Sequence, residues 1–146
     1  MSGDHTSTSN HHKEVLIEDL NLIQSKNSSL FENKEFFVLS PSVQNTKMWF
    51  DLRKVNLDRQ PANKKGLIII RLFDDFLLIY LEDFSTEMID KNPFDTANSG
   101  IHWKYQIHTN SPSHSYIINM KSKKKFEVSI INKLTLLSSS LVKTLN

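Results

Sequence analysis

The sequence contains no cysteine and only three glycines among its 146 residues. Without cysteine, neither a disulfide nor a thiolate metal site is available. With so few glycines, the chain has no Gly-x-Ser-x-Gly nucleophile elbow, no Walker phosphate loop and no dinucleotide fingerprint. A His-Glu-x-x-His metal motif is absent as well. These absences exclude the common hydrolase, nucleotide-binding and zinc-protease motifs.

Long apolar runs are also missing. No run approaches the roughly 20 residues that a bilayer-spanning helix needs, and the N-terminus MSGDHTSTSNHHKE carries no apolar signal segment. The lack of cysteine suits a reducing compartment. We therefore expect a soluble, cytoplasmic protein with no membrane partner, of a length that suits one domain with a core of its own.

Acidic residues are scarce in the last third of the chain. The formal net charge is only +2, but residues 98–146 hold seven lysines and one acid, Glu127. A charge step of this kind is typical of a side that faces a polyanion. It is equally typical of a lysine-protected edge strand, and the composition does not separate the two interpretations.

The most apolar stretch runs from Gly66 to Met88. It holds two short runs rich in β-branched and aromatic residues, 67–70 and 76–80, around Asp74 and Asp75. This pattern predicts a β-hairpin with a polar turn, because adjacent aspartates suit a turn better than a strand. A short helix over 84–89, capped by Asp83, is expected next.

The rest of the chain favours short strands. Strands are predicted over 35–40, 48–52, 101–108, 116–120 and 126–131, and an amphipathic helix over 13–25. Residues 1–12 are expected to be a disordered tail, 13–132 a single domain, and 133–146 a tail or a linker to a further domain. The predicted fold class is mainly β with short helices (α+β), a six- to seven-stranded barrel or open pseudobarrel.

The segment 101–108 shows the cleanest alternation. Ile101, Trp103, Tyr105 and Ile107 are predicted to face one side, and His102, Lys104, Gln106 and His108 the other. The two histidines lie about 20 Å apart on a straight strand and cannot share a metal ion. The pattern predicts a half-buried strand with a hydrogen-bonding outer face.

Catalytic patterns are weak. Glu32-Asn33-Lys34, with Asp19 upstream, has the letters of a metal-dependent nuclease core, but its flanks are polar where a buried strand is needed. We therefore expect no catalytic residue, metal or cofactor, and keep a small metal-dependent nuclease as an alternative.

The polar stretches that remain have the residue types of a DNA-recognition surface, since Lys and Arg hold phosphates while Arg, Asn, Gln and Lys read base edges. The candidate DNA-binding residues are Ser42, Gln44, Asn45, Lys47, Arg53, Lys54, Asn56, Arg59, Lys64, Lys65, Asn98, Ser99, His102, Lys104, Gln106 and Asn110. Gln44, Arg53, Asn56 and Arg59 are the candidates for base reading. Lys47, Lys64, Lys65, Lys104 and the turn 121–125 are the candidates for phosphate binding.

The order of the segments FFVLSP, WFDLR, GLIIIRLFDDFLLIYLEDF, IHWKYQI, YIINM and EVSII resembles a DNA-recognition module of restriction-modification enzymes. Such modules share the pseudobarrel of the plant B-three domains and also occur on McrBC-like, GTP-dependent systems, including the LlaJI type. The resemblance covers roughly residues 35–132. Ser40-Pro41 stands where that family has His-Pro, and His102-Trp103 where it has Trp-His.

The resemblance implies a non-catalytic module that grips double-stranded DNA with two loop-bearing arms, here 40–59 and 98–111, beside a downstream motor or nuclease domain. One alternative is a PUA- or YTH-like reader of a modified base or single-stranded RNA. Trp49, Phe50, Trp103 and Tyr105 would then form an aromatic cage, although core packing is the preferred role for these four rings.

Overall fold

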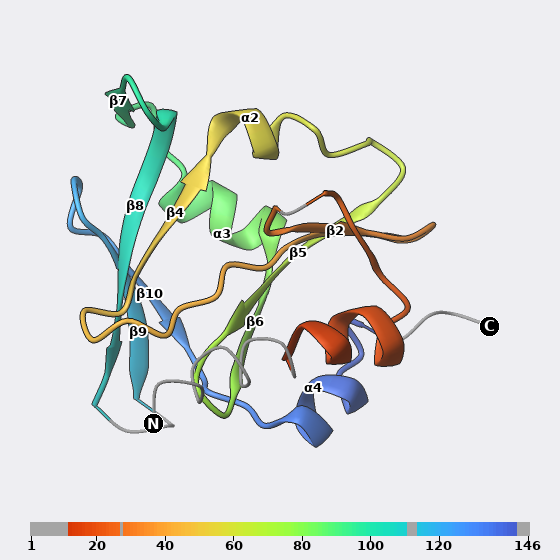
Figure 1. The fold of residues 1–146 in the computed structure, drawn as a ribbon. Coiled ribbons are helices and arrows are strands. Elements are labelled where there is room, and N and C mark those ends of the chain that lie inside the picture. Colours follow the sequence, from red (N-terminus) through yellow and green to blue (C-terminus); the bar gives the residue numbers. More distant parts are fainter. Residues whose placement is uncertain (1–11, 27, 111–113, 143–146) are drawn as a thin grey trace.

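The structure is a computed structural model and describes residues 12–26, 28–110 and 114–142. The described chain is mainly β with short helices, arranged as two sheets (Figure 1). Sheet A has the strand order β1-β2-β3-β5-β6. Its strands are β1 (Ile23–Gln24), β2 (Leu30–Glu32), β3 (Phe36–Leu39), β5 (Lys65–Arg71) and β6 (Phe76–Tyr80).

Sheet B has the order β10-β9-β8-β4, and a short strand, β7, also pairs with β8. Its strands are β4 (Trp49–Arg53), β7 (Phe94–Thr96), β8 (Gly100–Thr109), β9 (Ser115–Asn119) and β10 (Lys125–Val128). The helices are η1 (Val15–Asp19), a π-helical turn, and α2 (Lys54–Leu57), α3 (Leu81–Met88) and α4 (Lys133–Ser138). All pairings in sheet B are antiparallel, whereas β3 and β5 of sheet A run parallel.

The predicted hairpin is confirmed and lies at the centre of the fold. β5 pairs with β6 around the turn at Asp74 and Asp75, and β5 is buried on both faces. Ile68 and Ile70 belong to one hydrophobic cluster, while Leu67 and Ile69 belong to the other. Because side chains alternate along a strand, this one apolar run contributes to two cores.

The first core lies between sheet A and sheet B and includes the buried face of α3, which supplies Leu81, Phe84 and Met88. The second core lies on the other face of sheet A, under η1 and α4, with Leu16 and Leu136 fully buried. Figure 1 shows sheet B at the left of the view and the two terminal helical segments at the lower right. Sheet B therefore packs against one face of sheet A. The face of sheet B that points away from sheet A is not covered by it.

The predicted number of strands is wrong. The described residues contain ten strands rather than six or seven, because three of them, β1, β2 and β7, are only two or three residues long. Such short pieces carry no periodic pattern that a sequence can reveal. Neither sheet closes into a barrel within the described residues.

The two predicted helices have the wrong bounds, and a third helix, α2, is not predicted. The helix expected over 13–25 ends at Asp19, and Asn21 takes a positive φ of 55° before β1 begins. The segment after β4, where polar residues alternate with Val55 and Leu57, forms the single-turn helix α2. α3 begins at Leu81 rather than Phe84, and Tyr80 precedes its first residue without a side-chain cap.

The two termini that are predicted to be tails are described only in part. Residues 1–11 and 143–146 lie outside the described residues, but His12 is buried against Phe76, with ring centroids 4.5 Å apart. Residues 133–142 pack on the second core through Leu136 and Val142, so this segment belongs to the domain. In the described part of the chain, no helix has the length and apolar character needed to cross a membrane.

Candidate nucleic-acid interface

The two predicted polar segments are residues 40–59, the first segment, and residues 98–111, the second segment. They lie side by side where β4 pairs with β8 in sheet B. β4 pairs antiparallel with β8 over five residues, with Trp49 opposite Gln106. A side chain joins the segments at each end of this pairing. Arg53 Nε donates to the Ser99 carbonyl at 3.1 Å, and Gln106 Nε2 donates to the Lys47 carbonyl at 2.9 Å. The segments therefore form one continuous surface and are not two arms held apart.

Sheet B has an apolar inner face and a polar outer face. The inner face contributes Phe50, Leu52, Trp103, Tyr105, Ile107 and Ile117 to the first core. Directly paired residues project on the same side of a sheet, so the registers define what lies opposite. The side opposite the inner face is called the outer face, and it comprises Trp49, Asp51, Arg53, His102, Lys104, Gln106, His108, Tyr116, Ile118, Lys125 and Glu127.

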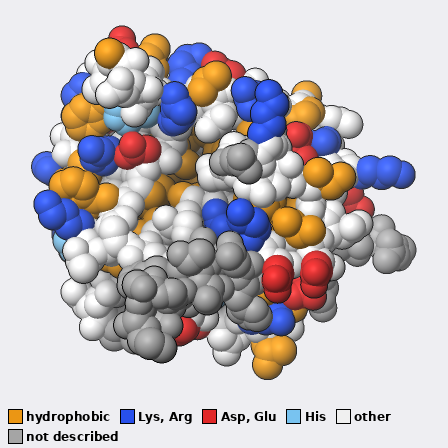
Figure 2. Space-filling model, in the orientation of Figure 1, with side chains coloured by type: hydrophobic (Ala, Val, Ile, Leu, Met, Phe, Trp, Pro, Cys, Tyr) orange, Lys and Arg blue, Asp and Glu red, His pale blue; other side chains and the backbone are white. Residues whose placement is uncertain are grey.

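Lysines on and beside the outer face lie over aromatic rings. The Trp49 ring centroid is 4.8 Å from Lys47 Nζ and 5.3 Å from Lys104 Nζ. Lys125 Nζ lies 4.8 Å from the ring centroid of Tyr116. These distances are within the range of a cation–π interaction. In the left part of Figure 2, Lys and Arg side chains alternate with hydrophobic ones.

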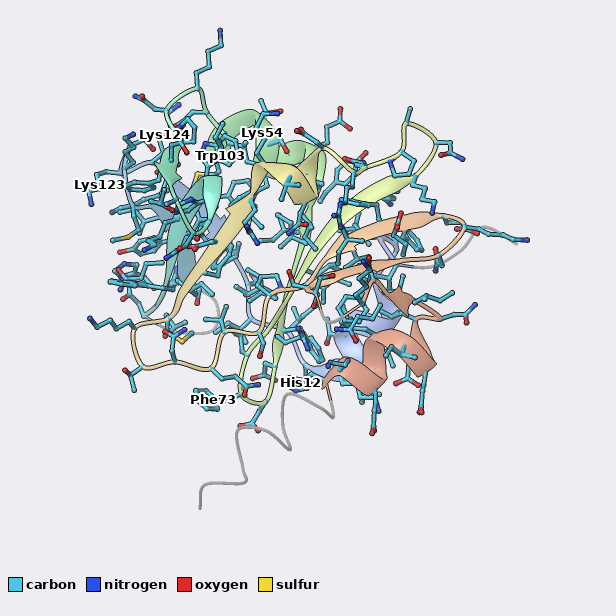
Figure 3. The ribbon with its side chains drawn as sticks, turned by 45° about the horizontal axis from the view of Figure 1, so that its top comes forward. His12, Lys54, Phe73, Trp103, Lys123 and Lys124 are labelled. Carbon is cyan, nitrogen blue, oxygen red and sulfur yellow. The ribbon has the colours of Figure 1, made fainter. Side chains whose placement is uncertain are left out.

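A fourth lysine is held in the same way at the upper end of the sheet. Lys121 Nζ lies 5.2 Å from the ring centroid of Phe94 and donates to the Pro93 carbonyl at 2.9 Å. Lys123 and Lys124 project from the adjoining β9–β10 turn (Figure 3). The lysine-rich turn therefore extends the cationic part of the outer face beyond the strands.

The cations of this surface have no acid partner within the described residues, as is also true of several lysines elsewhere, such as Lys26, Lys34 and Lys91. Within the described residues, the ion pairs are Lys54 with Asp58, Lys64 with Glu32, and Lys133 with Asp19. None of Lys47, Arg53, Lys104, Lys121 and Lys125 forms an ion pair there. The acids of the outer face are Asp51 and Glu127, so this surface carries an excess of positive charge that is available to an external anion.

The loop before β4 has a fixed backbone. Asn45 Oδ1 accepts the backbone N–H of Trp49 at 3.1 Å, and Asn45 Nδ2 donates to the Trp49 carbonyl at 3.2 Å. Met48 takes a positive φ of 58°, and its carbonyl accepts the N–H of Ile107 at 2.9 Å. These bonds turn the chain so that Lys47 stands beside Trp49. The Asn45 amide is therefore engaged by the Trp49 backbone, and Asn45 has a structural role.

The start of the first segment is anchored to sheet A. The buried guanidinium of Arg71 donates to the Ser40 carbonyl at 2.7 Å, and burial lowers the pKa of Arg71 to about 10. Ser42 bridges to Arg71, and Gln44 Nε2 donates to the Leu72 carbonyl at 3.2 Å. Ser42 and Gln44 therefore lie at the end of the central hairpin, away from the pairing of β4 with β8.

The later part of the first segment is partly engaged elsewhere. Lys54 and Lys64 form ion pairs, and Lys65 lies over the Tyr80 ring at 5.5 Å. Asn56 is half-buried within α2, and Arg59, which follows α2, is exposed. Of the predicted base-reading residues, Arg53 is the one on the outer face.

His102 corrects the prediction for the second segment. It is only 4% exposed, because its ring stacks on Phe94 at 5.7 Å and one ring nitrogen contacts the Gly100 carbonyl at 2.9 Å. β7 covers this end of β8, so His102 is not available to DNA. Asn98 and Asn110 are exposed at opposite ends of β8, and Ser111 lies outside the described residues.

Sequence patterns missed the aromatic residues of this surface. Tyr116 was expected to be an ordinary strand residue, yet its ring stacks on His108 at 4.8 Å and 3°. The stack joins β9 to β8, and the strand register that creates it is invisible in the local sequence. Phe94 begins β7, a three-residue strand that no sequence pattern predicts.

The predicted aromatic cage does not form. Phe50 and Tyr105 stack on each other inside the first core at 5.1 Å, and the Tyr105 hydroxyl donates to the Met88 carbonyl at 2.9 Å. Burial raises the pKa of Tyr105 above its ordinary value. Trp103 is 7% exposed, whereas Trp49 is 36% exposed. Core packing is therefore confirmed for three of the four rings, and Trp49 alone faces outward.

The two carboxylates of the nuclease alternative are each engaged in an ion pair. Glu32 lies in β2 and pairs with Lys64, while Asp19 lies in η1 and pairs with Lys133 of α4 at 3.6 Å. In the described part of the chain, no three His, Asp or Glu side chains are grouped so as to hold a metal ion. The Glu-x-Lys tripeptide thus takes part in a surface ion pair.

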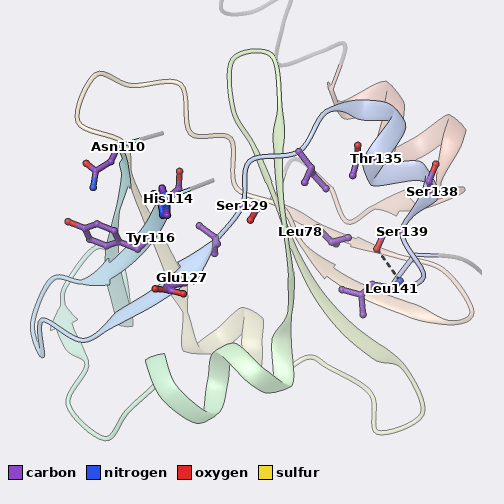
Figure 4. A pocket seen from close by; sticks show the side chains of 13 residues that line it. Leu78, Asn110, His114, Tyr116, Glu127, Ser129, Thr135, Ser138, Ser139 and Leu141 are labelled. Atoms are coloured by element: carbon purple, nitrogen blue, oxygen red, sulfur yellow. Dashed lines mark hydrogen bonds between the residues drawn. The ribbon is translucent and has the colours of Figure 1, made fainter. Parts of the chain in front are cut away.

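A cavity of about 960 Å³ opens between the ends of β9 and β10 and helix α4 (Figure 4). Its described lining mixes apolar side chains with hydroxyl groups, His114 and Glu127, and contains no Lys or Arg. It adjoins the outer face through Tyr116 and Glu127. The cationic part of the outer face therefore lies outside this cavity.

Comparison with protein-family models, with curated proteins and with solved structures yields no match to this chain.

Proposed function

We propose that this chain binds double-stranded DNA through the outer face of sheet B and its lysine turn, and that it is a non-catalytic recognition module. The observation that carries the proposal is that Lys47, Lys104, Lys121, Lys125 and Arg53 gather on and beside one face of sheet B. None of these side chains forms an ion pair within the described residues. Unpaired cations gathered on one side favour binding to a phosphate backbone.

The width of the surface supports a duplex as the ligand. β4 and β10 are separated by β8 and β9, so their axes lie about 14 Å apart at the usual strand spacing. The major groove of B-DNA is about 12 Å wide. Lys47 before the edge strand β4, Lys104 on the neighbouring strand β8 and Lys125 on the other edge strand β10 would suit the phosphates on the two sides of one groove.

Base reading is assigned to exposed polar groups at the margins of this surface. Arg53 uses its Nε for the Ser99 carbonyl, which leaves its terminal amino groups for acceptors such as guanine O6 and N7. Asn98 lies beyond the same end of β8 and Asn110 beyond the other. These three residues replace Gln44, Asn56 and Arg59 as the candidates for base contacts.

The resemblance to restriction-modification modules supplies the proposed context. The seven strands of four or more residues would correspond to an open pseudobarrel of the B-three type, here with two separate sheets. In that context the chain works in the cytoplasm beside a downstream motor or nuclease domain, which performs the cleavage. The chain itself contributes recognition and requires no cofactor.

Fluorescence anisotropy over a library of labelled duplexes, at two salt concentrations, tests this function. Binding should weaken with salt at a slope near −0.9 per neutralised phosphate. A preference for some duplexes should persist at the higher salt. Absence of binding to any duplex at low salt would remove the proposal.

A further inference from the structure

Several lysines on and beside the outer face lie over aromatic rings, an arrangement that adds to their positive charge. Four lysines lie over three aromatic rings. Lys47 and Lys104 lie over Trp49, Lys125 lies over Tyr116, and Lys121 lies over Phe94. The three rings come from β4, β9 and β7. The arrangement therefore recurs at three places on one side of sheet B.

Each of these rings is itself held in place. Asn45 fixes the backbone of Trp49 through two hydrogen bonds, and Lys47 and Lys104 both contact the indole ring. Tyr116 is stacked in parallel on His108, and Phe94 is stacked on the buried ring of His102. A lysine that rests on a fixed ring has fewer conformations than a lysine that extends freely into water.

That restriction matters for binding. A free lysine loses rotamer entropy when a phosphate immobilises it, and this loss weakens the complex. A lysine that a ring already restricts loses less on binding. The attraction between an exposed ammonium group and a ring is modest, so the ammonium group can still donate hydrogen bonds to a phosphate.

We propose that Trp49, Tyr116 and Phe94 are positioning residues, which hold Lys47, Lys104, Lys125 and Lys121 in place for the phosphates of double-stranded DNA. This inference rests on the proposed function and adds a role for the rings, which need not touch the bases. The same rings could instead stack on unpaired bases, and the test below distinguishes the two roles.

The test compares leucine and phenylalanine at the same position. Trp49→Leu removes the ring and should weaken duplex binding roughly tenfold, since two lysines lose their support. Tyr116→Leu should weaken it about three- to fivefold. Trp49→Phe and Tyr116→Phe keep a ring and should restore most of the affinity. In all four variants the salt slope should equal that of the wild type, because no charge is removed.

A second readout needs no DNA. Protons that lie over an aromatic ring resonate upfield, so the ε-methylene protons of Lys47 and Lys104 should shift upfield in the free protein and return to ordinary values in Trp49→Leu. Lys54, which pairs with Asp58 on α2, serves as the unshifted control. The fluorescence of the buried Trp103 reports whether each variant is folded.

Three results would overturn the inference. Duplex affinity equal to that of the wild type in both Trp49→Leu and Tyr116→Leu would contradict a positioning role while leaving the proposed function intact. Tighter binding of the wild type to single-stranded DNA than to duplex, with quenching of Trp49 emission, would assign the rings to base stacking. Failure of the wild type to bind any duplex would overturn the proposed function and this inference together.

Discussion

Gln106 Nε2 donates to the carbonyl of Lys47 at 2.9 Å, a bond between residues 59 positions apart in the sequence. It joins the loop before β4 to the middle of β8. The loop, the edge strand and the long central strand of sheet B therefore form one unit. The position of Lys47 on the outer face depends on this unit.

Replacement of Gln106 by alanine should release the loop. We expect the free energy of unfolding to fall by about 1–3 kcal/mol, the net contribution of two hydrogen bonds, because Gln106 Oε1 also contacts His108 Nε2 at 3.0 Å. Duplex affinity should fall as well. Gln60→Ala is a matched control, because Gln60 Nε2 also donates to a lysine carbonyl, that of Lys64, at 3.2 Å and outside the outer face. Denaturant unfolding and anisotropy measure the two effects. Equal losses of affinity in both variants would contradict the role of Gln106.

The Tyr105 hydroxyl should contribute to stability from inside the first core. Tyr105→Phe removes the donor to the Met88 carbonyl, which then retains the bond from Asn119 Nδ2 at 3.1 Å. We expect a loss of about 1 kcal/mol in the free energy of unfolding, measured with urea. An unchanged unfolding midpoint would show that this buried bond contributes nothing.

The same hydroxyl predicts a dependence on alkaline pH. Burial raises the pKa of Tyr105 above the ordinary value of 10.0, so above about pH 10 the unfolded state loses this proton while the folded state keeps it. The folded state then binds more protons, and stability falls as pH rises. Wild type should therefore lose stability between pH 9 and pH 11 faster than Tyr105→Phe, because the variant lacks the group. Parallel pH profiles of the two proteins would contradict this.

The C-terminal segment should behave as part of the domain. Leu136 is fully buried in the second core, so Leu136→Ala should destabilise the protein by about 2–5 kcal/mol. Leu134, on the same helix but 74% exposed, provides the control, and Leu134→Ala should change stability by less than about 0.5 kcal/mol. Thermal unfolding distinguishes them. Similar small effects at both positions would mean that α4 contributes little to the core.

Local patterns were enough to predict the elements that bury an apolar run or alternate strictly. The hairpin of β5 and β6 follows from two apolar runs around Asp74 and Asp75, and β8 follows from the alternation between Ile101 and His108. These patterns reflect burial along one strand, which a sequence records directly.

The candidate site depends on contacts between distant segments, and these were not predictable. The burial of His102 results from β7, a three-residue strand with no pattern of its own. The pairing of β4 with β8 decides that Lys47 and Lys104 meet at Trp49. Which lysines are neutralised by acids, such as Lys64 by Glu32, is likewise a tertiary property.

The central claim is that the outer face, and not the total charge, binds DNA. Two triple variants test it because each removes three positive charges from the same chain: Lys47→Met, Lys104→Met and Lys125→Met on the outer face, and Lys54→Met, Lys64→Met and Lys133→Met among the ion-paired lysines. Both can be compared with wild type by anisotropy over a range of salt concentrations.

We expect the outer-face variant to bind duplex DNA far more weakly than the wild type does. Its salt slope should be smaller in magnitude than that of the wild type by about 2.7, which corresponds to three lost phosphate contacts. The ion-paired variant should keep the wild-type slope and most of the affinity. Equal losses in the two variants, or a larger loss in the ion-paired variant, would contradict the assignment of the outer face as the DNA-binding surface.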